Sequence, residues 1–115
     1  MTTTVRDAAA GISAARTRRL RMARSTLRRV VDLLVHKYHV RRVVLIGSLA
    51  ESERFGFHSD IDIGVAGLAD GRFYEAAGEV LLLAEEFDID LIPIERAAPG
   101  MAARLERGVV VYDQG

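Results

Sequence analysis

Apolar residues repeat at two different periods along this chain, and the period predicts which segments are helices and which are strands. Over residues 14–39, apolar side chains recur every three, four or seven positions, which places them on one face of a long amphipathic helix. The pattern frays towards Met1, where Gly11 interrupts it. The predicted buried face consists of Leu20, Ala23, Leu27, Val30, Val31, Leu34 and Tyr38. We therefore expect this helix to pack against the rest of the chain through that face.

The rest of the chain changes period several times, which predicts strands that alternate with shorter helices. Residues 43–46 form a β-branched run typical of a buried strand, and residues 48–54 are expected to form a short helix. Apolar and polar residues then alternate over 61–65, the pattern of a strand with one special face. The later elements are a helix over 73–87 with Asp70 as its N-cap, a strand over 89–94 that stops near Pro93, a short helix opened by Pro99 and ended by Gly108, and a strand over 109–112. The order predicts one α/β (α+β) domain over residues 1–115.

Composition fits a single compact domain, but the charge is unevenly distributed. The 115 residues are 50% hydrophobic and carry no net charge. Residues 1–42 hold 11 of the 16 Lys and Arg and only two acids, so residues 43–115 hold 5 basic and 14 acidic side chains. The basic helix could therefore attract a partner protein, nucleic acid or the acidic part of a second copy in a homo-oligomer, and a partner protein is the favoured interpretation.

Targeting and redox signals are absent from the sequence. It contains no cysteine, which excludes disulfides and thiolate chemistry. It also has no apolar run long enough for a signal peptide or a membrane span. We expect a cytoplasmic protein that does not contact membranes.

Candidate chemistry is concentrated in two short stretches. Asp60 and Asp62 lie two positions apart, so both carboxylates project from the same face of a strand. Two neighbouring carboxylates repel each other unless they hold a cation, and Mg2+ prefers oxygen ligands together with substrate phosphates. Upstream, Gly47 allows a tight turn, and Ser48 offers its hydroxyl and amide at the start of the next helix, where anions bind. The combination predicts a triphosphate held between Gly47–Ser48 and a metal on the two aspartates.

A third carboxylate is expected on the next strand. Phosphoryl transfer is commonly assisted by two metal ions, and a third carboxylate then bridges them or activates the nucleophile. Asp90 is the preferred residue for this role, with Asp88, two positions earlier, as the alternative. Two Mg2+ ions and ATP or another nucleoside triphosphate are therefore the expected cofactor and substrate.

These motifs, in this order, resemble the DNA polymerase β-like nucleotidyltransferase superfamily, and most of all its minimal nucleotidyltransferases. The matching residues are Gly47-Ser48, then Asp60-Ile61-Asp62 after eleven intervening residues, and Asp90-Leu91-Ile92, within a region from about residue 43 to the end. The resemblance implies a mixed sheet flanked by helices, a catalytic core over 43–115 behind the basic helix of 1–42, and Mg2+ on Asp60, Asp62 and Asp90. Many members of this branch are antitoxins paired with a HEPN-domain toxin, and some attach AMP to that toxin.

The chain departs from the family pattern directly after Ser48. Members usually read Gly-Ser-x-Ala-x-Gly, often with arginine at the first x. Here Leu49 stands at the first x, and Ser52 stands in place of the second glycine. Two hypotheses follow: an enzyme of the protein adenylyltransferase type that modifies a HEPN-type toxin, or a catalytically weak binding module that neutralises its partner by contact. A subunit that acts on nucleic acid or on a small molecule is a further alternative.

Overall fold

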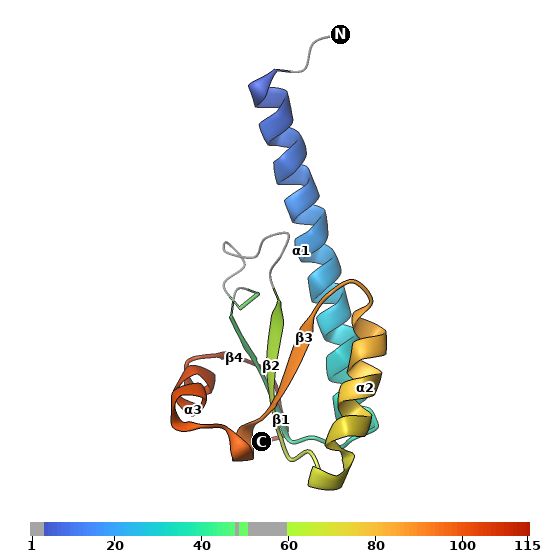
Figure 1. Cartoon of the computed structure of the whole chain (residues 1–115), viewed down its shortest axis with the longest axis vertical. Coiled ribbons are helices and arrows are strands. Elements are labelled where there is room, and N and C mark those ends of the chain that lie inside the picture. The colour runs from blue at the N-terminus through green and yellow to red at the C-terminus, as the bar shows by residue number, and fades with distance from the viewer. Residues whose placement is uncertain (1–3, 48, 51–59) are drawn as a thin grey trace.

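The computed structural model describes residues 4–47, 49–50 and 60–115, and Figure 1 shows how their elements are arranged. A long helix, α1, extends well beyond a small sheet, and the molecule measures 59 × 28 × 23 Å. The helices are α1 (Val5–His36), α2 (Phe73–Ala84) and α3 (Pro99–Glu106), with 3-10 turns η2 (Asp70–Arg72) and η3 (Ile94–Arg96). The strands are β1 (Arg42–Ile46), β2 (Ile61–Ala66), β3 (Ile89–Pro93) and β4 (Val109–Asp113).

The strands form one mixed sheet in the order β3-β2-β1-β4. β1 pairs antiparallel with both β2 and β4, and β2 pairs parallel with β3. The connection from β2 to β3 runs through α2, because parallel neighbours require a crossover. The predicted mixed sheet flanked by helices is therefore confirmed.

Each face of the sheet is covered by different helices. The larger apolar core lies between the sheet and the helices α1 and α2, and it includes Leu45 and Ile63. The smaller core joins the opposite face to α3 through Val44, Ile46 and Leu105. Alternation along β2 therefore places Ile61, Ile63 and Val65 towards α1 and α2, and turns the residues between them towards α3.

Helix α1 is longer at its N-terminal end than the sequence pattern indicates. A capping box starts it, in which the Thr4 hydroxyl accepts a hydrogen bond from the Asp7 amide and the Asp7 side chain accepts one from the Thr4 amide. Its buried residues are Ala23, Thr26, Leu27, Val30 and Leu34, so the helix packs on the core only through its C-terminal half. The amphipathic pattern located this packed half, and the cap accounts for the extension.

Polar contacts fix the end of α1 against α2. The buried Tyr38 hydroxyl donates to Glu75 (3.2 Å), the Arg72 guanidinium lies over the Tyr38 ring, and Lys37 pairs with Glu79. Burial, followed by the hydrogen bonds with these two glutamates, raises the pKa of Tyr38 to about 12. Glu75 and Glu79 are thus already committed to internal partners.

Three predictions about local structure are corrected or lie outside the described residues. Asp70 does not cap α2, because it begins the η2 turn and Arg72 stands at the N-cap position. The turn chemistry around Asp70 therefore delays the helix by one short 3-10 turn. α2 also ends at Ala84, three residues before the predicted end, because Glu85 adopts a φ of 54° and breaks the helix. The helix expected over 48–54 lies mostly outside the described residues.

None of the described helices combines the length and the apolar character needed to cross a bilayer.

Candidate active site

Two of the predicted aspartates face each other across the parallel pair of strands. Asp62 of β2 is in register with Asp90 of β3, and neighbouring strands lie about 4.8 Å apart. Because side chains alternate between the two faces of a sheet, both residues belong to the face that α3 covers. Asp60 directly precedes β2, has the same parity and is exposed. The sheet thus brings carboxylates that are 28 positions apart in sequence next to each other.

Gly47 lies directly after β1 and beside Asp62. It follows Ile46, which pairs with Asp62 across the antiparallel strands β1 and β2, and it has a φ of 81°. A Cβ atom at this position would lie 3.0 Å from Oδ2 of Asp62, a close approach for an oxygen atom. Glycine is therefore favoured here for two reasons: the left-handed backbone and the close approach to the carboxylate.

The pKa of Asp62 reflects the negative charges of the neighbouring carboxylates. Burial raises the pKa of this carboxyl above its ordinary value, and the charge of Asp90, a hydrogen bond with Asp90 and the charge of Asp60 raise it further. The carboxylates therefore act on one another as a group that a cation would stabilise.

Arg104 is a neighbour of this group that the sequence analysis missed. Its positive charge lowers the pKa of Asp62, against the other influences. Arg104 lies on α3 directly before Leu105, which is buried against the α3 face of the sheet. No spacing in the sequence connects Arg104 to Asp62, because only the packing of α3 onto β2 brings the two together.

The other predicted residues are placed as follows. Ser48 lies outside the described residues, as do Ser52 and the rest of the segment 51–59. Asp88, the alternative to Asp90, lies in the turn before β3, where its carbonyl accepts a hydrogen bond from the Ile61 amide (2.8 Å). The register therefore favours Asp90 over Asp88 as the neighbour of Asp62, while the role of each aspartate stays a prediction.

The residues present fit a hard divalent cation in part. Asp62 and Asp90 supply two carboxylates, and Mg2+ usually takes one or two of these together with phosphate oxygens and water. Within the described ranges, no group of three or more His, Cys, Asp or Glu side chains is arranged to hold a metal ion. Asp62 and Asp90 are thus neighbours that could share a cation, and the coordination of Mg2+ by Asp60, Asp62 and Asp90 stays a prediction.

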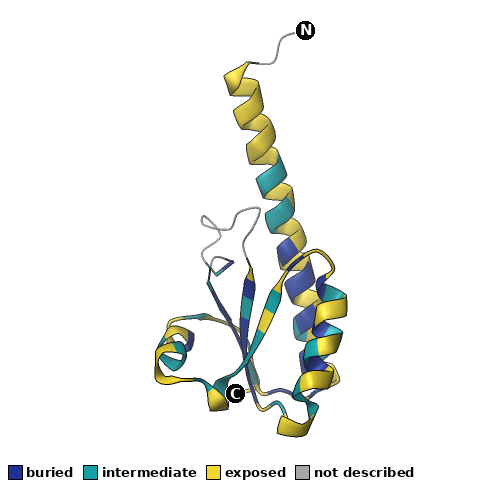
Figure 2. Cartoon of the chain, viewed as in Figure 1, coloured by how far each residue is buried: buried dark blue, intermediate teal, exposed yellow. Residues whose placement is uncertain are grey.

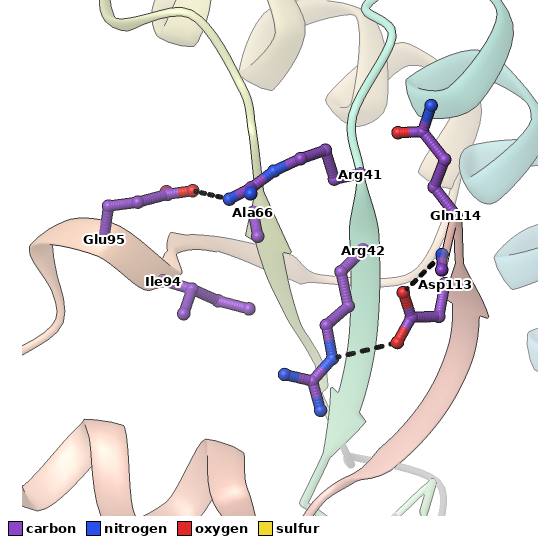
Figure 3. A pocket seen from close by; sticks show the side chains of 8 residues that line it. Arg41, Arg42, Ala66, Ile94, Glu95, Asp113 and Gln114 are labelled. Atoms are coloured by element: carbon purple, nitrogen blue, oxygen red, sulfur yellow. Dashed lines mark hydrogen bonds and ion pairs between the residues drawn. The ribbon is translucent and has the colours of Figure 1, made fainter.

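A hollow lies at the end of the sheet where β1 begins, away from Asp62 and Asp90. Figure 3 shows Arg41 directed towards Glu95 and Arg42 towards Asp113, with N–O distances of 3.5 and 3.9 Å. The hollow has a volume of about 330 Å³ and is also lined by Ala66, Ile94, Gln114 and Gly115. Each arginine is paired with a carboxylate, so this hollow offers less attraction for an anionic ligand than two free arginines would.

Solved structures that resemble this chain include minimal nucleotidyltransferases. A minimal nucleotidyltransferase is 25% identical, with a TM-score of 0.61 over 77% of this chain and 91% of that one. The chain has the minimal nucleotidyltransferase fold. The predicted resemblance is therefore confirmed at the level of the fold.

Two further neighbours are complexes that contain proteins of this kind. A chain of a toxin–antitoxin complex with AMP-PNP is 22% identical, with a TM-score of 0.60 over 74% of this chain and 72% of that one. A chain from the complex of a tri-AMPylated HEPN toxin of Shewanella oneidensis with its minimal nucleotidyltransferase antitoxin is 18% identical, with a TM-score of 0.56 over 82% of this chain and 72% of that one. No protein-family model and no curated protein sequence matches the chain.

Proposed function

We propose that this protein is a Mg2+-dependent nucleotidyltransferase that moves AMP from ATP onto a hydroxyl group of a HEPN-type toxin, and so acts as the antitoxin of the pair. The observation that carries the proposal is the register of Asp62 with Asp90 beside Gly47. The minimal nucleotidyltransferase fold supports the same reaction class, and the neighbours in toxin–antitoxin complexes support the choice of partner.

The proposed reaction is an in-line displacement at the α-phosphorus. The acceptor oxygen forms a bond to this phosphorus, the bond to the pyrophosphate oxygen breaks, and pyrophosphate leaves. Asp90 assists removal of the proton from the acceptor hydroxyl, and Asp60 and Asp62 hold the cation. Mg2+, when bound, neutralises the phosphate oxygens and stabilises the charge that develops on the leaving group.

Two further groups complete the proposed site. Gly47 leaves space beside Asp62 for a phosphate to approach the strand. Arg104 supplies a positive charge that acts on Asp62, and a guanidinium forms strong charge-assisted hydrogen bonds with phosphate oxygens. We therefore assign Arg104 to binding of the triphosphate.

The test uses α-labelled ATP, Mg2+ and the HEPN-type protein encoded by the adjacent gene. We expect label on the partner, none in the presence of EDTA, and none with Asp62→Ala or Asp90→Asn. Asp88→Asn is the matched control, because it removes the same charge two positions from Asp90 and outside the strand. It should retain transfer.

Two results would separate this proposal from its alternative. A stable complex of the two proteins that never becomes labelled would favour a binding module that neutralises its partner by contact. Wild-type turnover by Asp62→Ala would show that the aspartates are not the site. Asp62→Ala should fold at least as stably as the wild type, because it relieves repulsion between like charges.

A further inference from the structure

Strand β4 lies at an edge of the sheet. It is the last strand in the order β3-β2-β1-β4, so among the described residues one of its two sides has no neighbouring strand. Its three consecutive valines, Val109, Val110 and Val111, are 48%, 44% and 38% exposed. Val111 also has no partner residue on β1, because the register shifts between Val43 and Val44. Unpaired backbone groups beside exposed β-branched side chains favour the addition of another strand.

The other edge of the sheet has features that oppose strand addition. β3 carries the charged Asp90 and ends at Pro93, and charged residues and proline commonly prevent a further strand from pairing with an edge. β4 contains no proline and no lysine, and its one charged residue, Asp113, stands at its end. We therefore expect strand addition at β4 and not at β3.

A groove lies beside the open edge, where β4 meets α1. It has a volume of about 480 Å³ and is lined by Arg24, Leu27, Arg28, Val31 and Asp32 of α1 and by Val111 and Tyr112 of β4. Its apolar lining is buried at Leu27 and half-buried at Val31 and Tyr112. Side chains of a strand stand roughly perpendicular to the sheet, so a segment added to β4 would direct every second side chain towards this groove.

Two arginines make the rim of the groove basic. Arg24 and Arg28 are four positions apart, which places them one turn apart on the same side of α1. Both are exposed, and Figure 2 shows buried and exposed residues alternating around this half of the helix. Neither guanidinium forms a hydrogen bond or an ion pair with another described residue. Asp32 lies one turn further along, so the groove keeps a net positive charge and favours an acidic ligand.

We propose that an extended, acidic segment of a partner protein binds to β4 as a fifth strand of the sheet. Its backbone pairs with the open side of β4 and supplies affinity, while its acidic side chains meet Arg24 and Arg28 and supply specificity. The alternate side chains of the segment lie on the other face, beside the exposed Val110. The segment therefore combines acidic residues on one face with apolar residues on the other.

This binding is separate from the proposed reaction. Asp62 and Asp90 belong to the face of the sheet that α3 covers, whereas the groove lies between β4 and α1. Substitutions on the rim of the groove should therefore leave nucleotidyl transfer unchanged when the acceptor does not depend on this contact.

A second copy of this chain fits the groove less well than an acidic segment does. A two-fold pair of β4 strands has its axis perpendicular to the joined sheet, so both α1 helices would lie on the same face. The groove of each copy would then face the groove of the other, and Arg24 and Arg28 of both copies would repel. Nucleic acid offers phosphates to the arginines but no chain of amides and carbonyls to pair with β4.

The probe is a synthetic octapeptide of alternating valine and glutamate with blocked ends. It is titrated into the 15N-labelled protein at a salt concentration of about 0.15 M. We expect amide shifts to change along residues 24–31 and 109–113, with a dissociation constant of about 1 mM or tighter. The same peptide with lysine in place of glutamate should bind at least about tenfold more weakly, because it opposes like charges.

N-methylation of the peptide tests whether it adds as a strand. In an extended chain the amides of the glutamates point to one side and the amides of the valines point to the other, so only one of these sets can face β4. One peptide is methylated at its glutamate amides and a second at its valine amides. One of the two should lose binding and the other should keep it.

Charge reversal on α1 tests the role of the arginines. Arg24→Glu with Arg28→Glu should weaken binding of the valine–glutamate peptide at least about tenfold and strengthen binding of the valine–lysine peptide. The control Arg6→Glu with Arg18→Glu makes the same change in charge on α1 outside the groove, beyond the screening length of about 8 Å, and should bind like the wild type. All four arginines are exposed, so circular dichroism should show that both variants stay folded.

Four outcomes would overturn the proposal. The first is no binding of the valine–glutamate peptide at millimolar concentration. The second is an equal effect of the two methylated peptides, because the peptide would then not be paired as a strand. The third is binding that Arg24→Glu with Arg28→Glu leaves unchanged. The fourth is a dimer of the free protein in sedimentation velocity that the peptide dissociates, which would assign the edge of β4 to a second copy.

Discussion

At Asp62, burial and two neighbouring carboxylates act on the pKa of one carboxyl in one direction, and one neighbouring arginine acts in the other. Burial, Asp90 and Asp60 all disfavour its ionised form, while Arg104 favours it. The carboxylate is therefore held in a state that costs free energy in the absence of a cation. The same arrangement would be stabilised by a bound cation, as the proposed function requires.

The first prediction at this scale concerns stability and pH. Because folding raises the pKa of Asp62 above 3.8, the folded protein binds more protons than the unfolded one between 3.8 and the raised pKa. The free energy of unfolding should therefore fall as pH rises through that window, in urea titrations with EDTA. Asp62→Asn, which mimics the protonated form, should remove this part of the pH dependence. Parallel curves for the two proteins would contradict the assignment.

The second prediction concerns Arg104. Arg104→Ala should raise the KM for MgATP about tenfold or more, because a hydrogen bond to a charged group contributes about 1.5–3 kcal/mol. Arg107→Ala is the control, since Arg107 stands at the C-cap of the same helix and is not among the charges that dominate the pKa of Asp62. Steady-state kinetics measure both. A KM unchanged by Arg104→Ala would place the triphosphate elsewhere.

At the scale of elements, the seating of α3 depends on the absence of side chains. A Cβ atom on Gly64 would lie 2.4 Å from Cδ2 of Leu105, and one on Gly108 would lie 2.5 Å from Cγ1 of Val44. These two glycines allow α3 to approach β2 and β1 closely, and this approach brings Arg104 to Asp62. The distance between helix and sheet is therefore part of the site.

Gly64→Ala tests this dependence. Overpacking should destabilise the fold by about 1–3 kcal/mol, and any outward shift of α3 should also raise the KM for MgATP. Gly78→Ala is the matched control, because a Cβ atom added there would meet nothing outside the backbone of α2 within 4 Å, and it should stabilise the protein by about 0.5–1 kcal/mol. Urea unfolding of both variants gives the comparison, and an equal effect of the two substitutions would contradict it.

At the scale of the whole molecule, α1 divides into a packed half and a projecting half. The pair between Arg19 and Glu86 (3.9 Å) and the position of Arg19 over the Phe87 ring mark the end of the packed half. None of residues 4–22 is buried. The projecting half therefore contributes little to the stability of the fold.

Truncation tests whether the projecting half and the packed half of α1 contribute differently to stability. Deletion of residues 1–18 should change the free energy of unfolding by less than about 0.5 kcal/mol and leave nucleotidyl transfer intact. Deletion of residues 1–30 should cost more than about 3 kcal/mol, because it removes Ala23, Leu27 and Val30 from the core. Thermal and urea unfolding measure both, and a large loss from the shorter deletion would show that the projecting half supports the fold.

The sequence by itself determined the four strands, the helices α2 and α3 and the packed face of α1, because these follow from the local period of apolar residues, while the mixed sheet was expected from the family resemblance. It also placed Asp60 and Asp62 on one face of a predicted strand, but left Asp88 and Asp90 as alternatives on the next, because residues two positions apart point to the same face. Asp70 shows the limit of such patterns, because the turn chosen there depended on how the chain leaves β2. The N-terminal end of α1 shows another, since the cap at Thr4 continues the helix where the apolar pattern weakens.

Only the tertiary structure decided which distant residues became neighbours. The parallel register selected Asp90 over Asp88 as the neighbour of Asp62, and the packing of α3 added Arg104, which no sequence spacing indicates. The exposed apolar residues of α1 and α2, such as Ile12 and Leu82, likewise became visible only once the packed sides of both helices were known. Periodicity states that a helix has an apolar face, whereas the contacts made by the rest of the chain determine how much of that face remains exposed.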